Sequence, residues 1–273
     1  MKTVRAPLSP ARQAGTAADA KSQEWPWHPL QMIMLTIAVF AVSQFGVAAF
    51  LIAGGVVASL IAGQGSNAAE TLLSGSTVTQ FATILIIESL VVLGVWWLLR
   101  RKGLGLRDIG VVRPRWADIG LALLALGVYF TVFVAIVAII EQYVPGLDTE
   151  QRQEIGFEDA SNPLQLVLVF TSLVILAPIA EEVLFRGFLF TGLRRRLRFV
   201  WAALLTSILF GAAHLLGGEQ GASLLWIAGI DTMVLSIVLC FLRERTGRLW
   251  APVLLHALKN CIAFSLLFIF NVA

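Results

Sequence analysis

Long runs of apolar residues, each nearly free of charge, dominate the sequence from residue 30 onward. A bilayer core about 30 Å thick is crossed by a helix of about 20 apolar residues. Seven runs approach or exceed this length, at 30–62, 77–99, 119–144, 164–190, 200–216, 222–242 and 249–272. An eighth span results if Gly54 and Gly55 divide the first run. The sequence therefore predicts an all-α fold, a polytopic transmembrane helical bundle of about seven spans or eight.

The composition supports a membrane protein and excludes several soluble classes. Hydrophobic residues make up 58% of the 273 residues and charged residues 14%, whereas soluble domains carry about 25% charged residues. Such a chain has too few charges to cover a water-soluble globule. We therefore exclude a soluble enzyme, a disordered protein and a nucleic-acid-binding domain. The two cysteines, Cys240 and Cys261, lie in apolar runs and indicate no disulfide framework.

The first 29 residues differ from the rest because they are polar and contain four prolines. We expect residues 1–29 to form a disordered cytoplasmic tail and residues 30–272 to form one transmembrane domain. The apolar run that follows the tail is longer than the apolar region of a signal peptide. It is therefore predicted to be a retained first span.

The cationic residues predict how the bundle is oriented. Of the 20 Lys and Arg residues, 17 fall in the tail and in the loops after the second, fourth and sixth spans. The positive-inside rule places these segments in the cytoplasm and the C-terminus outside. Tryptophans, Trp25 and Trp27 among them, flank the same span ends, as in an interfacial belt. We expect an integral protein of the plasma (cytoplasmic) membrane, in contact with the lipid bilayer.

Polar side chains inside the predicted spans gather at a similar level, within about one or two helical turns of each other. They are Glu88, Glu181, Glu182, Arg186, His214, Asp231, His256, Lys259 and Asn260. At 1.5 Å per residue, one such group on each of five spans lies about 18 to 22 Å from the nearest cytoplasmic loop. Ionisable residues cost several kcal/mol at this depth and are functional candidates. The pattern predicts a buried polar cavity near the middle of the membrane.

The helical spacing of these residues separates a structural pair from a reactive set. Glu182 and Arg186 are four residues apart and share a helix face, which predicts an ion pair. Glu181 is rotated about 100° from Glu182 and points elsewhere. A buried carboxylate, two histidines and an amide can activate a water and stabilise the oxyanion formed when that water attacks a carbonyl. These groups are supplied by Glu181, His214, His256 and Asn260.

Structural roles are the alternative for each of these residues. Membrane histidines and asparagines also form simple helix–helix hydrogen bonds. Glu88, Asp231 and Lys259 have no role in the hydrolytic scheme, and we expect them to pair or to line the cavity. Lys259 has two candidate partners, Asp231 and Glu88.

Three short motifs carry a family resemblance. They read Glu-Glu-x-x-x-Arg at 181–186, Phe-x-x-x-His at 210–214 and His-x-x-x-Asn at 256–260. All three occur in this order, and each lies on its own predicted span. The set resembles the CPBP family, the CAAX prenyl protease and bacteriocin-processing (Abi) family of intramembrane proteases. The resemblance covers about 162–263, which would be the protease core.

The resemblance implies a role for each motif residue. Glu181 is the implied catalytic base, and His214 helps to activate the water. His256 and Asn260 form the implied oxyanion site. The residues implied to support the site are Glu182 and Arg186. The chain would then be an intramembrane endopeptidase acting on peptides or membrane proteins, with CAAX-type or lipidated substrates among them, and not on nucleic acid.

Two alternatives remain open, one for the cofactor and one for the function. Family members are commonly named metalloproteases, and a zinc ion held by Glu181, His214 and His256 is chemically compatible. Because the chain has no His-Glu-x-x-His motif, we expect a metal-free reaction and no cofactor. The alternative function is a transporter or bacteriocin-immunity protein without catalysis. Its buried proton relay would use Glu88, Glu181, Asp231 and Lys259.

Overall fold

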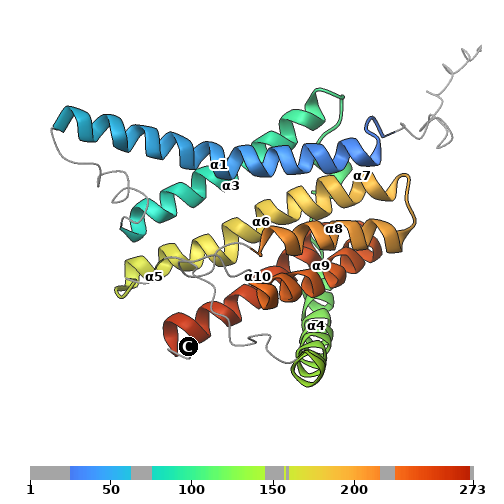
Figure 1. Ribbon diagram of the computed structural model, residues 1–273. Helices are drawn as coiled ribbons and strands as arrows, with labels where there is room; N and C mark the ends of the chain where they lie inside the picture. The colour runs from blue at the N-terminus through green and yellow to red at the C-terminus, as the bar shows by residue number, and fades with distance from the viewer. Residues whose placement is uncertain (1–24, 63–75, 145–156, 158–159, 216–224, 271–273) are drawn as a thin grey trace, which may run out of the picture.

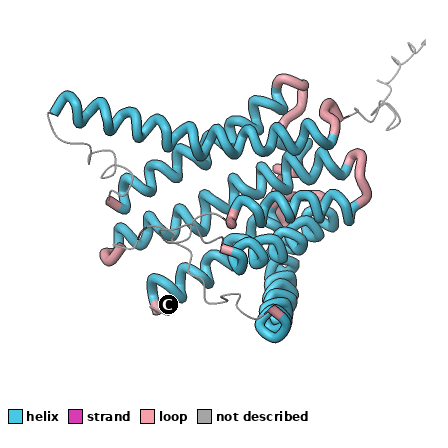
Figure 2. Tube along the Cα trace, viewed as in Figure 1, coloured by secondary structure: helices cyan, strands magenta, loops and turns pink. Residues whose placement is uncertain are grey.

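Helices make up nearly all of the part of the chain that the computed structural model describes, residues 25–62, 76–144, 157, 160–215 and 225–270. Figure 2 shows no strand in this part. The elements are α1 (Pro29–Ala62), α3 (Thr77–Arg100), η1 (Leu106–Ile109), α4 (Trp116–Tyr143), α5 (Pro163–Phe170), η2 (Thr171–Leu176), α6 (Ala177–Glu181), η3 (Glu182–Phe190), α7 (Thr191–Arg194), α8 (Phe199–Ala213), α9 (Trp226–Thr246), α10 (Trp250–Phe264) and η4 (Ser265–Ile269). The predicted all-α membrane bundle is confirmed.

Each of the seven predicted apolar runs corresponds to a helix, and one of these helices is short. Six helical stretches of the described chain are long and apolar enough to cross a membrane, namely Pro29–Val57, Thr77–Arg100, Trp116–Tyr143, Pro163–Arg194, Trp226–Thr246 and Trp250–Ile269. The predicted span 200–216 corresponds to α8, which has 15 residues and rises only about 22 Å. Helix α1 continues through Gly54 and Gly55, so the first run is not divided. Among the described residues, six helices are therefore long enough to span a membrane, and one apolar helix is shorter.

A continuous helix from Pro163 to Arg194, made of α5, η2, α6, η3 and α7, occupies the middle of the bundle. The side chain of Asn162 caps its first turn by accepting a hydrogen bond from the Gln165 backbone at 3.0 Å, and Pro163 holds the first helical position. The segments η2 and η3 are π-helical. Because π segments are rare and occur frequently at functional sites, this helix is a candidate to carry the functional site.

The other helices surround this central helix. It contacts α1, α3, α8, α9 and α10. Figure 1 shows α1, the central helix and α10 running across the view, whereas α4 is seen nearly end-on. Helix α4 packs on α9 and α10. The central helix is thus covered by other helices, and α4 is the oblique outer member of the bundle.

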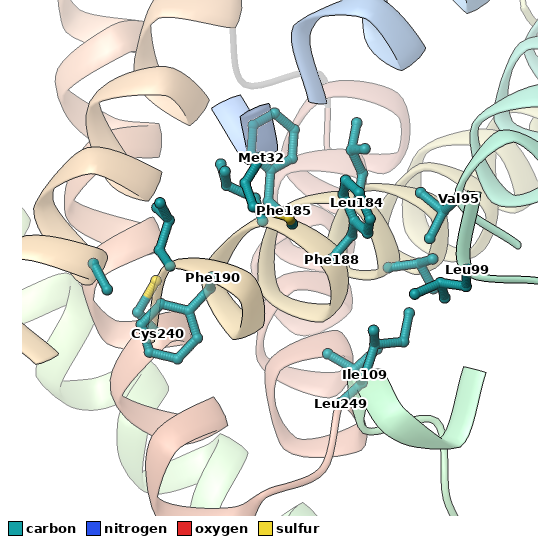
Figure 3. Packing of buried hydrophobic residues seen from close by; sticks show 14 of the residues in the cluster. Met32, Val95, Leu99, Ile109, Leu184, Phe185, Phe188, Phe190, Cys240 and Leu249 are labelled. Atoms are coloured by element: carbon teal, nitrogen blue, oxygen red, sulfur yellow. The ribbon is translucent and has the colours of Figure 1, made fainter. Parts of the chain in front are cut away.

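All nine residues of η3 are buried. Figure 3 shows Leu184, Phe185 and Phe188 of this segment beside Met32 and Leu99 from other helices. A π-helical segment therefore forms the centre of the main apolar cluster, and it contains Glu182 and Arg186 of the Glu-Glu-x-x-x-Arg motif, whereas Glu181 is the last residue of α6.

Trp25 and Trp27 are packed inside this cluster, which corrects two expectations. Their side chains are 5% and 7% exposed. Trp27 meets Phe188 edge-to-face at 5.4 Å, and the Trp25 indole N–H donates to the sulfur of Met32. These two residues are therefore not part of an interfacial belt, and the predicted disordered tail 1–29 is packed from Trp25 onward. Residues 1–24 of that tail lie outside the described residues.

The loops that follow α3, α7 and α9 meet at one end of the bundle. The Leu249 backbone N–H donates to the carbonyl of Gly110 at 3.1 Å. An ion pair joins Arg248 to Asp118 at 2.5 Å. The hydrogen bond to Asp118 raises the pKa of Arg248 above its ordinary value. At the same end, Arg194 of α7 pairs with Glu244 of α9 at 2.6 Å. The three cationic loops of the charge pattern therefore lie on one side.

Glycines bring α8 and α9 into close contact, and Gly211→Ala is expected to destabilise the protein by about 1–3 kcal/mol. A Cβ atom added at Gly211 would lie 2.7 Å from the carbonyl oxygen of Gly229, which is a backbone atom and cannot turn away. The matched control is Gly127→Ala, because a Cβ there meets nothing within 4 Å. Thermal unfolding in detergent measures both variants, and equal melting temperatures would contradict this packing.

Candidate active site

The Glu182 carboxylate holds an arginine and a histidine together. Its Oε1 accepts from Nη1 of Arg186 at 2.9 Å and from Nδ1 of His256 at 3.0 Å. The side chains of Glu182 and Arg186 are fully buried, and that of His256 is 5% exposed. The predicted ion pair is confirmed. Because an ionised carboxylate only accepts hydrogen bonds, Nδ1 of His256 carries a proton and its Nε2 is directed elsewhere.

Glu181 lies across from that second nitrogen. Its Oε2 is 3.8 Å from Nε2 of His256, which is too long for a direct hydrogen bond but suits a bridging water. Unlike Glu182, the Glu181 side chain is 22% exposed and makes no ion pair with Arg186. The two adjacent carboxylates therefore differ as the spacing predicted, because Glu182 is engaged and Glu181 is available.

Phe210 lies between the arginine and the two histidines. Its ring centroid is 4.3 Å from the guanidinium carbon of Arg186, 4.7 Å from the His214 ring and 5.9 Å from the His256 ring. Nδ1 of His214 lies 2.8 Å from the Phe210 carbonyl oxygen, so it acts as the donor and Nε2 points away from this bond. Sequence reasoning used Phe210 only as a motif position, although the structure places it at the centre of the site.

Asn260 is directed toward another part of the central helix. Its side-chain nitrogen donates to the backbone carbonyl of Leu173, in η2, at 2.8 Å. This contact is the interhelical hydrogen bond that sequence reasoning kept as the alternative. The oxyanion role of Asn260 stays a prediction, and it would use the remaining amide N–H.

The other ionisable residues divide into two sets. Lys259 pairs with Asp231 at 2.8 Å, and the Tyr129 hydroxyl also donates to Asp231. Of the two candidate partners of Lys259, Asp231 is therefore confirmed. Glu88 lies on α3, which packs against α6, the segment that ends at Glu181. The four residues of the alternative proton relay therefore form two separate pairs. One lies where α3 meets α6, and the other where α9 meets α10.

The predicted zinc ligands do not form one cluster in the structure. His256 approaches Glu181, but no group of three or more His, Cys, Asp or Glu side chains is arranged to hold a metal ion among the described residues. A structural zinc site needs four ligands and a catalytic one three. The arrangement of Glu181, His214 and His256 therefore does not fit a zinc ion, and we derive no step through one.

Two kinds of comparison relate the chain to known proteins. Residues 163–262 match the family described as type II CAAX prenyl endopeptidase Rce1-like. The chain is 31% identical over 121 residues to "Putative membrane peptidase YdiL" of Bacillus subtilis, covering 44% of this chain and 45% of that protein. It is 38% identical over 104 residues to an "Uncharacterized 24.3 kDa protein" of Escherichia coli, covering 37% and 44%. The chain thus spans less than half the length of each relative. No solved structure matches it.

Proposed function

We propose, because residues 163–262 match the type II CAAX prenyl endopeptidase Rce1-like family, that this chain is an intramembrane endopeptidase using water activated by Glu181. The observation that carries the proposal is the 3.8 Å separation between Oε2 of Glu181 and Nε2 of His256. A water that bonds to both atoms would lie beside the line that joins them. The buried Glu182 and Arg186 hold the histidine ring in this orientation.

The charges of the site support a specific division of labour. The proposed oxyanion site requires a proton on both ring nitrogens of His256 when the substrate reacts, with the carboxylates of Glu181 and Glu182 beside it. Both ring nitrogens of a protonated histidine are donors. Nε2 can then donate to the oxyanion that forms on the attacked carbonyl, with Asn260 as a second donor.

The reaction then proceeds by general base catalysis. Glu181 accepts a proton from the water, and the water oxygen forms a bond to the carbonyl carbon of the substrate. The C–N bond breaks, and Glu181 returns the proton to the leaving amine. His214, whose ring is fixed by the Phe210 carbonyl, orients the water. The substrate is a peptide or membrane protein, and CAAX-type or lipidated peptides are the first to test.

Reconstitution tests the proposal directly. Purified protein in liposomes, mixed with lipidated and unlipidated peptides, is expected to produce cleavage products detected by mass spectrometry. The alternative transporter or immunity protein would yield none. Substrate-dependent proton flux without cleavage would favour that alternative over an endopeptidase.

Chelation is expected to leave the activity unchanged, because we propose a metal-free reaction without a cofactor. Activity is measured before and after dialysis against a chelator, and elemental analysis gives the metal content of the same sample. One zinc ion per chain, with activity lost on chelation and restored by zinc, would overturn the metal-free proposal.

The cationic end of the bundle is proposed to face the cytoplasm, with the protein in the plasma membrane. Arg196→Cys introduces a thiol at an exposed turn of this end, whereas Cys240 is buried. A membrane-impermeant maleimide is expected to label this variant only after the cells are opened. The unsubstituted protein reports any background from Cys261, and labelling of intact cells would reverse the proposed orientation.

A further inference from the structure

A second polar site lies outside the candidate active site, in a cavity between α4, α9 and α10. The cavity has a volume of about 290 Å³, near the lower end of the range for small-ligand sites. Most of its wall is apolar and includes Phe130, Phe133 and Ile262, and its polar part includes Asp231 and Lys259. None of these residues takes part in the proposed hydrolysis.

The Lys259 ammonium group has N–H donors in this cavity that Asp231 does not use. Both carboxylate oxygens of Asp231 are engaged, Oδ1 by the Tyr129 hydroxyl and Oδ2 by Nζ of Lys259. An ammonium group has three N–H donors, and Asp231 is the one partner of Lys259 in the described chain. The Lys259 side chain is 21% exposed. The cavity therefore offers N–H donors surrounded by apolar side chains.

The cavity and the candidate active site share two helices. On α10, Lys259 directly precedes Asn260 and lies about 4.5 Å along the helix axis from His256. On α9, the cavity residues Ala228 and Asp231 flank Gly229, which packs against Gly211, three residues before His214. The cavity and the candidate active site therefore draw on the same two helices at a similar level along α10.

We propose that this cavity binds an unwound apolar segment of the peptide substrate, beside the bond that is cut. A bulky apolar side chain of the substrate packs against Phe130, Phe133 and Ile262, and a substrate carbonyl accepts from Lys259. This inference rests on the proposed endopeptidase function. A peptide must leave its helix before water can attack it, and each backbone group released inside a membrane costs several kcal/mol unless it finds a partner.

Filling the cavity tests the proposal with a matched control. Phe133→Trp enlarges a side chain of the cavity wall, and Phe241→Trp makes the same change on an exposed face of α9. The substrates are peptides that differ only in having Ala or Phe beside the cleaved bond. Phe133→Trp is expected to lower kcat/KM for the Phe peptide about 10-fold or more, mainly through KM, and to spare the Ala peptide. Phe241→Trp is expected to leave both unchanged.

The double variant Lys259→Met/Asp231→Leu tests the polar part of the cavity. It removes both charges together, so neither is left unpaired. Its affinity for a fluorescent Phe peptide is measured in the Glu181→Gln background, where binding does not require cleavage. We expect a loss of about 10-fold, corresponding to one lost hydrogen bond to a charged group. An unchanged affinity would overturn the role of Lys259.

The cleavage assay and the binding assay together distinguish a failure of this inference from a failure of the proposed function. If the protein cleaves peptides and Phe133→Trp leaves the preference for Phe over Ala unchanged, the cavity is not a substrate site, although the endopeptidase proposal stands. If the protein cleaves no peptide, the endopeptidase proposal fails. The binding arm still decides the inference, because weaker binding in Phe133→Trp but not in Phe241→Trp supports it and equal binding overturns it.

Discussion

Glu181→Gln is expected to abolish peptide cleavage while the protein stays folded. Glutamine has nearly the shape of glutamate, but its amide cannot accept a proton from water. Losing a general base costs about 10²- to 10⁴-fold in rate, and the 3.8 Å separation from His256 would no longer hold a reactive water. Glu181 makes no hydrogen bond to Arg186 or to the His256 ring, so its replacement leaves the Glu182 contacts intact.

Two measurements check this prediction. Reconstituted protein gives the rate of peptide cleavage, and proteomics of membrane-protein termini compares cells that carry the protein with cells that carry the variant. Glu141→Gln, at the exposed end of α4, is the matched control and is expected to keep full activity. Full activity in Glu181→Gln itself would reject the proposed mechanism.

Arg186→Met is expected to destabilise the protein by about 3–5 kcal/mol, the cost of breaking one side of a buried ion pair. Glu182 would then keep a negative charge that is fully buried and bound only by His256. The contact of the guanidinium with the Phe210 ring would also be lost. Thermal unfolding in detergent and the yield of folded protein measure the effect.

The double variant Glu182→Gln/Arg186→Met shows how much of the lost stability comes from the unpaired charge of Glu182. Because it leaves no unpaired charge, it is expected to be more stable than Arg186→Met alone. Arg196→Met, on the exposed turn between α7 and α8, is the matched control and is expected to change stability little. If Arg186→Met unfolds at the same temperature as Arg196→Met, the buried pair does not stabilise the fold.

Local spacing was enough to predict the contacts within one helix. The pair Glu182 and Arg186 followed from a separation of four residues, and the different environments of Glu181 and Glu182 followed from helical rotation. The hydrogen bond from His256 to Glu182 joins residues 74 positions apart. No spacing rule predicts such a contact, because it depends on how α10 packs on the central helix.

Other differences have identifiable physical causes. Lys259 had two acidic candidates at similar depth, and only the packing of α9 on α10 selects Asp231. Tryptophans at the end of a span are typical of an interfacial belt. Trp25 and Trp27 instead pack in the core, against Met32 and Phe188. The π segments η2 and η3 were not predicted, because apolar periodicity was interpreted with the α-helical repeat throughout.

The shared acceptor Oε1 of Glu182 has a consequence for how this protein can vary among its homologues. One oxygen atom binds both Arg186 and His256, so any change at position 182 alters two partners at once. Aspartate, one methylene shorter, would reach His256 only if the central helix and α10 moved closer together. Substitutions at the three positions are therefore expected to be coupled. A homologue that has replaced one of them is expected to have replaced the other two.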